Sequence, residues 1–223
     1  MSADADFRRA FETEGRFWLR GLFDEAEVEA LRALAADDAR PGARIDAAHP
    51  LFQAVARSAL SRRLAAIWPG MRPVRLVAFN KTETVNWGVP WHQDRVIAVR
   101  ERAEAPGFGQ WSQKAGAWHC EPPTELLRRM IFTRIHLDDS TVENGAMEIA
   151  PGSHRFGLVA AEDAARIAGE HAAEPTIGRA GDVLALSMLT LHRSGKSVSD
   201  APRRALRVDY AAGDLPPPLK WAF

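Results

Sequence analysis

The chain has 223 residues, enough for one domain with a sizeable core, and its 29 Lys and Arg residues equal its 29 Asp and Glu residues. A formal net charge of zero argues against a surface for nucleic acid or an anionic membrane. The single cysteine, Cys120, excludes an intramolecular disulfide and favours a reducing cytoplasm. We expect one soluble, cytoplasmic domain over 1–223, a monomer or homodimer with no nucleic-acid or membrane partner.

The first 70 residues are predicted to be mainly helical, with one short strand at 17–19. Asp24 and Glu27 have the spacing of a capping box, which opens a helix. Apolar residues then recur at helical spacing, so this helix has one apolar face. A second helix is predicted over 51–68, where Pro69 and Gly70 end it.

From residue 74 onward, short apolar runs alternate with Gly, Pro, Asn and Asp, a pattern typical of strands. Strands are predicted at 74–79, 130–137, 147–149, 182–187 and 205–210, with a helix at 160–168. Helices followed by many short strands predict a mainly β sandwich or barrel, with the 1–70 part packed on one outer face. The aromatic segment 100–123 has no period, and we interpret it as a lid or substrate loop.

A His-x-Asp pair occurs twice. On an extended strand, residues two apart point to the same side, so His92 and Asp94 can both face one metal ion. Imidazole and carboxylate suit Fe(II), and a second imidazole completes a facial triad with three open positions. However, His136 and Asp138 have the same spacing on another predicted strand. The spacing alone does not choose between the two pairs.

His192 follows the predicted strand 182–187 and is the candidate for the third ligand. The chain then enters a last strand that carries two adjacent arginines, Arg203 and Arg204. A guanidinium provides a fixed, bidentate grip on a carboxylate, such as the distal carboxylate of 2-oxoglutarate. Alternation leaves the choice of arginine open: Arg204 points inward if the apolar face lines a barrel, and Arg203 does so if helices cover that face.

Four ordered blocks resemble the phytanoyl-CoA dioxygenase family, and the similarity runs from Gly15 to Ala212. Together the blocks are specific, although each alone is not. They are the opening 14–23, the metal motif Trp91-His92-Gln93-Asp94, the central 137–154 with Glu143-Asn144-Gly145, and the closing Gly181-Asp182, His192-x-Ser194-Gly195 and Arg203-Arg204-Ala205-Leu206.

The resemblance implies a double-stranded β-helix (jelly roll, cupin-like) with N-terminal helices. It assigns Fe(II) to His92, Asp94 and His192, and the 2-oxoglutarate carboxylate to Arg203 rather than Arg204. It places Gln93 and Ser194 near that cosubstrate. The implied reaction uses O₂, with ascorbate as a supporting reductant, to hydroxylate a small molecule while 2-oxoglutarate becomes succinate and CO₂. Related halogenases replace the carboxylate ligand by a small residue, so Asp94 favours hydroxylation or desaturation.

The substrate is not defined by the resemblance. Arg134 stands where some relatives have an aromatic residue, which predicts a more polar pocket wall. Arg134 and Lys114 are candidates for an anionic substrate, although ordinary salt bridges explain them equally well. Trp111 and His119 are further substrate candidates. Two alternatives remain: a cupin-like metal-dependent isomerase or lyase, which has no need of Arg203, and a non-catalytic sensor of 2-oxoglutarate or metal.

Overall fold

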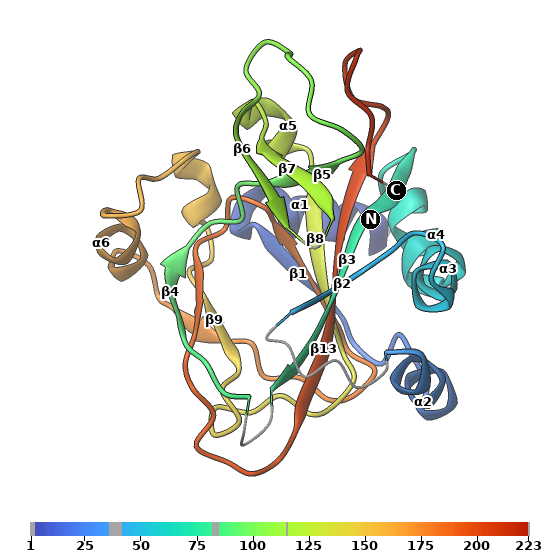
Figure 1. The fold of residues 1–223 in the computed structure, drawn as a ribbon. Coiled ribbons are helices and arrows are strands. Elements are labelled where there is room, and N and C mark those ends of the chain that lie inside the picture. The colour runs from blue at the N-terminus through green and yellow to red at the C-terminus, as the bar shows by residue number, and fades with distance from the viewer. Residues whose placement is uncertain (1–2, 36–41, 82–84, 115, 223) are drawn as a thin grey trace.

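The computed structural model describes residues 3–35, 42–81, 85–114 and 116–222, and its framework is a six-stranded antiparallel sheet (Figure 1). In spatial order its strands are β1 (Arg16–Leu19), β11 (Val183–Ser187), β8 (Ile131–His136), β13 (Arg203–Ala212), β3 (Met71–Lys81) and β2 (Ala43–Ile45).

A four-stranded sheet lies opposite this large sheet, and a three-stranded sheet lies at one end of the space between them (Figure 1). The two facing sheets form the jelly roll that the sequence predicts. The smaller sheets contain β10 (Glu174–Pro175), β9 (Met147–Ile149), β12 (His192–Ser194) and β4 (Val89–His92), and then β5 (Ile97–Val99), β7 (Ala117–Glu121) and β6 (Gly109–Lys114).

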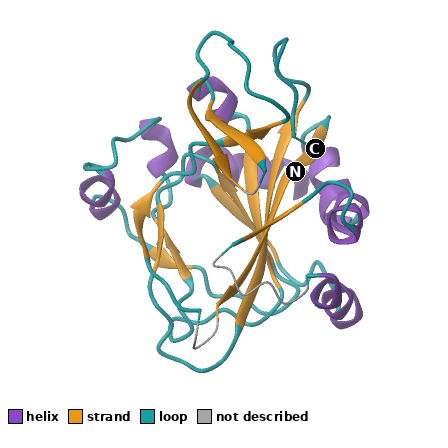
Figure 2. Ribbon diagram, in the orientation of Figure 1, coloured by secondary structure: helices purple, strands orange, loops and turns teal. Residues whose placement is uncertain are grey.

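Four N-terminal helices cover the outer face of the large sheet, and two short helices lie elsewhere (Figure 2). The first four are α1 (Ala3–Glu14), α2 (Glu25–Leu34), α3 (Pro50–Arg57) and α4 (Ala59–Ile67); the others are α5 (Thr124–Arg128) and α6 (Ala164–Gly169). Within the described ranges, no helix is both long enough and apolar enough to cross a bilayer.

The main core lies between these helices and the sheet, and the residues in it show which face of β13 points toward the helices. Leu206, Val208 and Tyr210 are buried in the same cluster as helical Leu51 and Leu64. The apolar face of β13 therefore points outward to the helices. Because side chains alternate along a strand, the opposite face of β13, which starts at Arg203, points into the jelly roll.

Two predicted elements differ from the structure. The helix expected over 51–68 is two helices, because Ser58 is extended (ψ 167°) and its side chain caps α4 by accepting a hydrogen bond from the Ser61 N–H at 3.4 Å. The segment 100–123, interpreted as a lid or substrate loop, contains more regular structure than its sequence indicated. Strands β6 and β7 pair as an antiparallel hairpin, and Gly116, just before β7, has a φ of +79°.

Candidate metal centre

Strand pairing brings the two predicted histidine ligands together. His92 on β4 and His192 on β12 are direct neighbours across the ladder, and their ring centroids are 4.2 Å apart. The Nδ1 of His92 donates to the Pro90 carbonyl at 2.8 Å, and the Nδ1 of His192 donates to the Thr190 carbonyl at 2.9 Å. In each neutral ring, the other nitrogen, Nε2, then carries the lone pair that can bind a metal ion.

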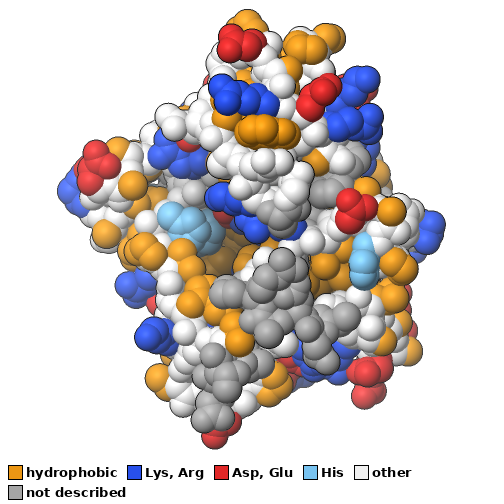
Figure 3. Space-filling model, viewed as in Figure 1, with side chains coloured by type: hydrophobic (Ala, Val, Ile, Leu, Met, Phe, Trp, Pro, Cys, Tyr) orange, Lys and Arg blue, Asp and Glu red, His pale blue; other side chains and the backbone are white. Residues whose placement is uncertain are grey.

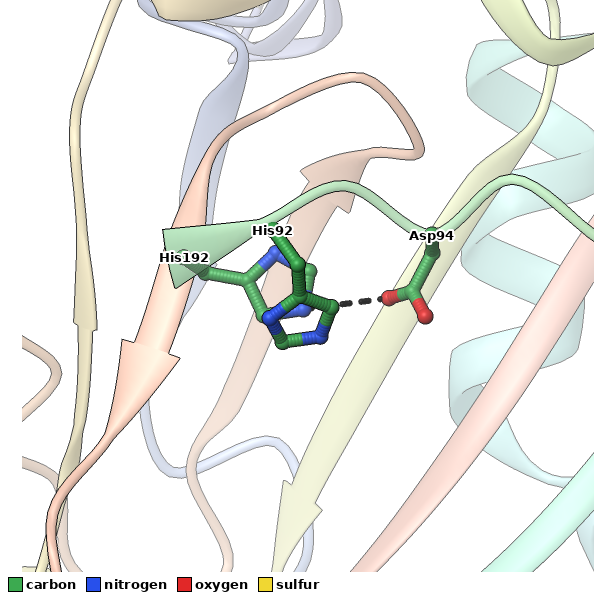
Figure 4. A group of neighbouring side chains, drawn as sticks. All are labelled: His92, Asp94 and His192. Carbon is green, nitrogen blue, oxygen red and sulfur yellow. Dashed lines mark ion pairs between the residues drawn. The ribbon is translucent and has the colours of Figure 1, made fainter. Parts of the chain in front are cut away.

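Asp94 reaches the same point from just beyond the end of β4 (Figure 4). Its backbone N–H donates to the Met188 carbonyl at 3.2 Å, and its Oδ2 lies 3.2 Å from the His192 Nε2. One ligand atom from each of the three residues lies within 4.8 Å of the others. Side chains that point at one another with lone pairs repel unless a cation lies between them, so this donor set fits a metal ion.

The second oxygen of Asp94 is held by Arg207 on β13. Burial opposes ionisation of the Asp94 carboxyl, but the Arg207 guanidinium outweighs burial and holds the pKa of Asp94 well below its ordinary value. Asp209 in turn accepts from the Arg207 Nε at 2.7 Å and pairs with Arg75 at 3.2 Å. This chain of alternating charges fixes the carboxylate with Oδ1 toward Arg207 and Oδ2 toward the histidines.

The donor set is typical of a facial triad. Two neutral imidazoles and one carboxylate bind one side of an Fe(II) ion and leave the opposite side open. Burial, and then the neighbouring His192, lower the pKa of His92, which favours the neutral form that binds metal. Among the described residues, His92, Asp94 and His192 form the one cluster of at least three potential ligands.

The competing pair does not form such a site. His136 points into the jelly roll beside Trp18, with ring centroids 5.6 Å apart, and its Nε2 has no hydrogen-bond partner among the described residues. Asp138 lies past the end of β8, where Arg204 donates to it from Nε and Nη2 at 2.8 Å and Arg32 from Nη2 at 3.0 Å. The carboxylate of this second pair is therefore occupied by two arginines.

Arg203 and Ser194 are linked by Lys81, the last residue of β3, which lies opposite Arg203 on β13 and reaches Ser194 on β12. Arg203 is 5% exposed, and its Nε donates to the Asn144 carbonyl at 3.1 Å. The Lys81 Nζ donates to the Gly195 carbonyl at 2.6 Å and lies 3.4 Å from the Ser194 Oγ. Burial, and then Arg203, lower the pKa of Lys81 to about 8. These polar groups can bind a carboxylate.

Gly145 keeps this cluster accessible. Its φ is +74°, and a Cβ there would lie 2.9 Å from the Gly195 carbonyl oxygen and 3.2 Å from the Lys81 Nζ. A larger residue would therefore enter the space around the ammonium group, and this explains the glycine of the Glu143-Asn144-Gly145 block.

The side chain of Gln93, which the resemblance places near the cosubstrate, is hydrogen-bonded to the backbone. Its Nε2 donates to the carbonyls of Gly157 and Leu189, both at 2.7 Å, and its Oε1 accepts from the Val159 N–H at 2.9 Å. Both amide hydrogens are thus used by the backbone. Gln93 joins three loops behind the metal ligands and leaves no N–H for 2-oxoglutarate.

Three of the four substrate candidates lie on the β6–β7 hairpin. Lys114 is exposed, and Trp111 packs near Arg102, with 5.9 Å from guanidinium carbon to ring centroid. His119 is buried and lines a cavity of about 330 Å³ together with Arg44 and Arg75. Burial, and then Arg75, lower the pKa of His119 to about 4. The fourth candidate, Arg134, lies on the inner face of β8.

Sequence reasoning missed Arg207, Asp209, Arg75 and Lys81. The signal for Arg207 and Asp209 was present, because they share the face of Arg203 along β13. Arg75 and Lys81 lie opposite Asp209 and Arg203 on β3, and only the register of the two strands reveals these pairs.

Known proteins share both sequence and fold with this chain. A methylphosphonate hydroxylase from Gimesia maris is 32% identical over 117 residues, 49% of this chain and 44% of that protein. An ectoine dioxygenase from Halomonas elongata is 27% identical over 139 residues, 52% of this chain and 41% of that protein. The chain thus matches less than half of the length of each curated relative.

A crystal structure of EctD from S. alaskensis with 2-oxoglutarate and 5-hydroxyectoine superposes with a TM-score of 0.70, at 20% identity over 95% of this chain and 76% of that one. It supports the jelly-roll fold. The family model described as "Phytanoyl-CoA dioxygenase (PhyH)" matches residues 23–205. Because this match covers most of the chain, the protein belongs to the phytanoyl-CoA dioxygenase family.

Proposed function

We propose that this protein is a non-haem Fe(II)- and 2-oxoglutarate-dependent dioxygenase that oxidises a small organic molecule. The observation that carries the proposal is the convergence of His92, Asp94 and His192 within 4.8 Å, in the same interior as the buried Arg203. Membership of the dioxygenase family supports it. Both curated relatives are named for small-molecule substrates, which supports the substrate class.

Fe(II), 2-oxoglutarate and O₂ together would supply the oxidation of a C–H bond to an alcohol, coupled to the release of succinate and CO₂. His92, Asp94 and His192 would hold the metal. Asp94 is a carboxylate, and its presence favours hydroxylation or desaturation over halogenation. Arg207 would keep one Asp94 oxygen away from the metal, so that the other remains a single, fixed ligand.

Arg203, Lys81 and Ser194 would hold the distal carboxylate of 2-oxoglutarate. A carboxylate that enters this buried space gains two cations and a hydroxyl as partners, and charge-assisted hydrogen bonds are the stronger kind. The negative charge of the ligand would also favour the protonated form of Lys81. Ascorbate would keep the iron reduced.

The test is turnover of 2-oxoglutarate with matched arginine variants. The wild-type protein with Fe(II), ascorbate and 2-oxoglutarate should form succinate slowly even without a substrate. Arg203→Ala should weaken 2-oxoglutarate binding about 30-fold or more, because loss of a charged hydrogen-bond partner from a buried site costs about 2–3 kcal/mol.

Arg204→Ala is the control, since Arg204 pairs with Asp138 on the outer face. Unchanged 2-oxoglutarate binding in Arg203→Ala, together with no succinate from the wild type, would instead favour a metal-dependent isomerase or lyase. Binding of 2-oxoglutarate without any turnover would favour a sensor. We also propose a cytoplasmic location, which the single buried Cys120 supports.

A further inference from the structure

Arg134 lies beside the candidate metal centre on β8. It stands opposite Arg207 on β13 and opposite Leu184 on β11. Two residues earlier on the same face, the Phe132 ring packs against His192, with centroids 5.2 Å apart, and under Arg207 at 4.7 Å. Because a strand rises about 3.3 Å per residue, the Arg134 backbone is roughly 7 Å along the strand from the residue that contacts the metal ligand.

The Arg134 guanidinium has no counterion among the described residues. Within those residues it donates no hydrogen bond and forms no ion pair, and its guanidinium carbon lies 5.2 Å from the centroid of the Phe79 ring. Burial, and then Arg203 and Arg207, lower the pKa of Arg134 to about 9. A partly buried cation beside other cations is unfavourable unless an anion joins it.

The nearby carboxylates, Asp94 and Asp209, already pair with arginines other than Arg134. Asp94 pairs with Arg207, and Asp209 pairs with Arg207 and Arg75. Lys81, Arg203 and Ser194 are grouped near Gly195, where we place the distal carboxylate of 2-oxoglutarate. When 2-oxoglutarate places one carboxylate at the metal and the other at this site, Arg134 still has no anion of its own.

The surface of the molecule is hollowed on the face drawn in Figure 3. Figure 3 shows a hollow on the face where the jelly roll opens, with hydrophobic side chains on its floor and Lys and Arg side chains at its border. A short organic anion suits such a surface, because its body can contact apolar groups while its charged end meets a cation.

We propose that the substrate is a small organic oxyanion, a carboxylate, phosphonate or phosphate, and that Arg134 binds its charged group. The inference rests on the proposed function, since it assumes that 2-oxoglutarate occupies the Arg203 site. Arg134 lies roughly 7 Å along β8 from Phe132, which packs on the ligand His192, so an anion bound to Arg134 would lie near the metal centre. Arg134 therefore selects both the charge and the short length of the substrate.

The test measures anion binding while the cosubstrate site is filled. The protein is loaded with Ni(II) and 2-oxoglutarate, which prevents turnover, and is titrated calorimetrically with methylphosphonate, with propionate and with uncharged propionamide. We expect the wild type to bind at least one of the two anions and not the amide. Arg134→Gln should lower the affinity for that anion at least about ten-fold, whereas Arg134→Lys should retain part of it. The control Arg204→Gln should bind the anion as tightly as the wild type does.

Other outcomes overturn the proposal. Equal anion affinity in Arg134→Gln, or no anion binding to the loaded wild type, contradicts it. A loss of 2-oxoglutarate affinity in Arg134→Gln, with anion binding intact, assigns Arg134 to the cosubstrate instead. Failure of the proposed function has a different signature, because the wild type would then neither bind 2-oxoglutarate in the presence of Ni(II) nor form succinate with Fe(II).

Discussion

The chain contains two His-x-Asp pairs with the same spacing, and the fold gives them opposite surroundings. His92 and Asp94 meet His192 across the β4–β12 ladder. His136 is enclosed beside Trp18, whereas Asp138 is bound by two arginines past the end of β8. The first pair presents lone pairs to a shared point, and the second pair has its carboxylate neutralised.

The same strand, β13, makes this difference through its two faces. Arg207, on the inner face, holds one oxygen of Asp94 and leaves the other toward the histidines. Arg204, on the outer face, contacts both oxygens of Asp138. A carboxylate with one oxygen free can bind a metal ion, and one with both oxygens in ion pairs is structural.

The two His-x-Asp pairs should differ most in how the loss of their carboxylates, Asp94 and Asp138, affects Fe(II) affinity. Asp94→Ala deletes a metal ligand, so Fe(II) affinity should fall at least about 100-fold, since even groups behind the ligands contribute 10- to 100-fold. Asp138→Ala should leave Fe(II) affinity unchanged and lower the free energy of unfolding by about 1–3 kcal/mol, because it removes the carboxylate that Arg204 and Arg32 both contact. Equilibrium Fe(II) titration and chemical denaturation measure the two effects. Similar Fe(II) affinities in both variants would contradict the assignment.

Removal of Arg207 or of Arg204, the arginines that contact these carboxylates, should give a smaller difference in Fe(II) affinity. Arg207→Met frees the Asp94 carboxylate to rotate, so Fe(II) affinity should fall about 10- to 100-fold. Arg204→Met, on the other face of the strand, should leave it unchanged. Calorimetric Fe(II) titration of the two variants checks this prediction, and Arg207→Lys should restore part of the affinity. If the two methionine variants bind Fe(II) equally well, Arg207 has no role in orienting Asp94.

The smallest difference concerns pH and the second histidine. Burial lowers the pKa of His136 from its ordinary 6.5 to about 3, so below pH 6.5 the unfolded chain takes up a proton that the folded chain does not. The folded state therefore loses stability as pH falls from 7 toward 4, by at most about 1.4 kcal/mol per pH unit from this group.

His136→Gln removes this contribution, so denaturation of the metal-free variant should show a weaker decline in unfolding free energy between pH 7 and 5. An unchanged pH slope would mean that His136 is not held neutral in the fold. The pKa of His119 is also lowered, and His119→Gln should reduce the slope in the same direction.

Much of the fold follows from local pattern. Alternating apolar runs predicted β8, β9 and β11 closely, and Asp24 with Glu27 predicted the start of α2. The β6–β7 hairpin was not predicted, because Trp111, Ser112 and Gln113 show no alternation of apolar and polar residues. Its strands depend on pairing with each other and with β5.

The candidate site was predictable where family motifs exist and not where long-range register decides. The ordered blocks singled out His92, Asp94 and His192. Strand spacing alone did not distinguish the first two from His136 and Asp138. Alternation left Arg203 and Arg204 open, until the helices on the outer face placed Arg203 inside. Lys81 contacts Ser194 although the two residues are 113 positions apart in the sequence, and nothing local in the sequence indicates that contact.

The most direct test of the account is the position of iron in a crystal of the Fe(II)-loaded protein, located by anomalous scattering at the iron edge. We predict one strong peak at bonding distance, about 2.0–2.2 Å, from the Nε2 atoms of His92 and His192 and from one oxygen of Asp94. The Arg207 guanidinium should lie on the other oxygen of Asp94. A peak beside His136, or no peak among the three predicted ligands in iron-loaded protein, would contradict the account.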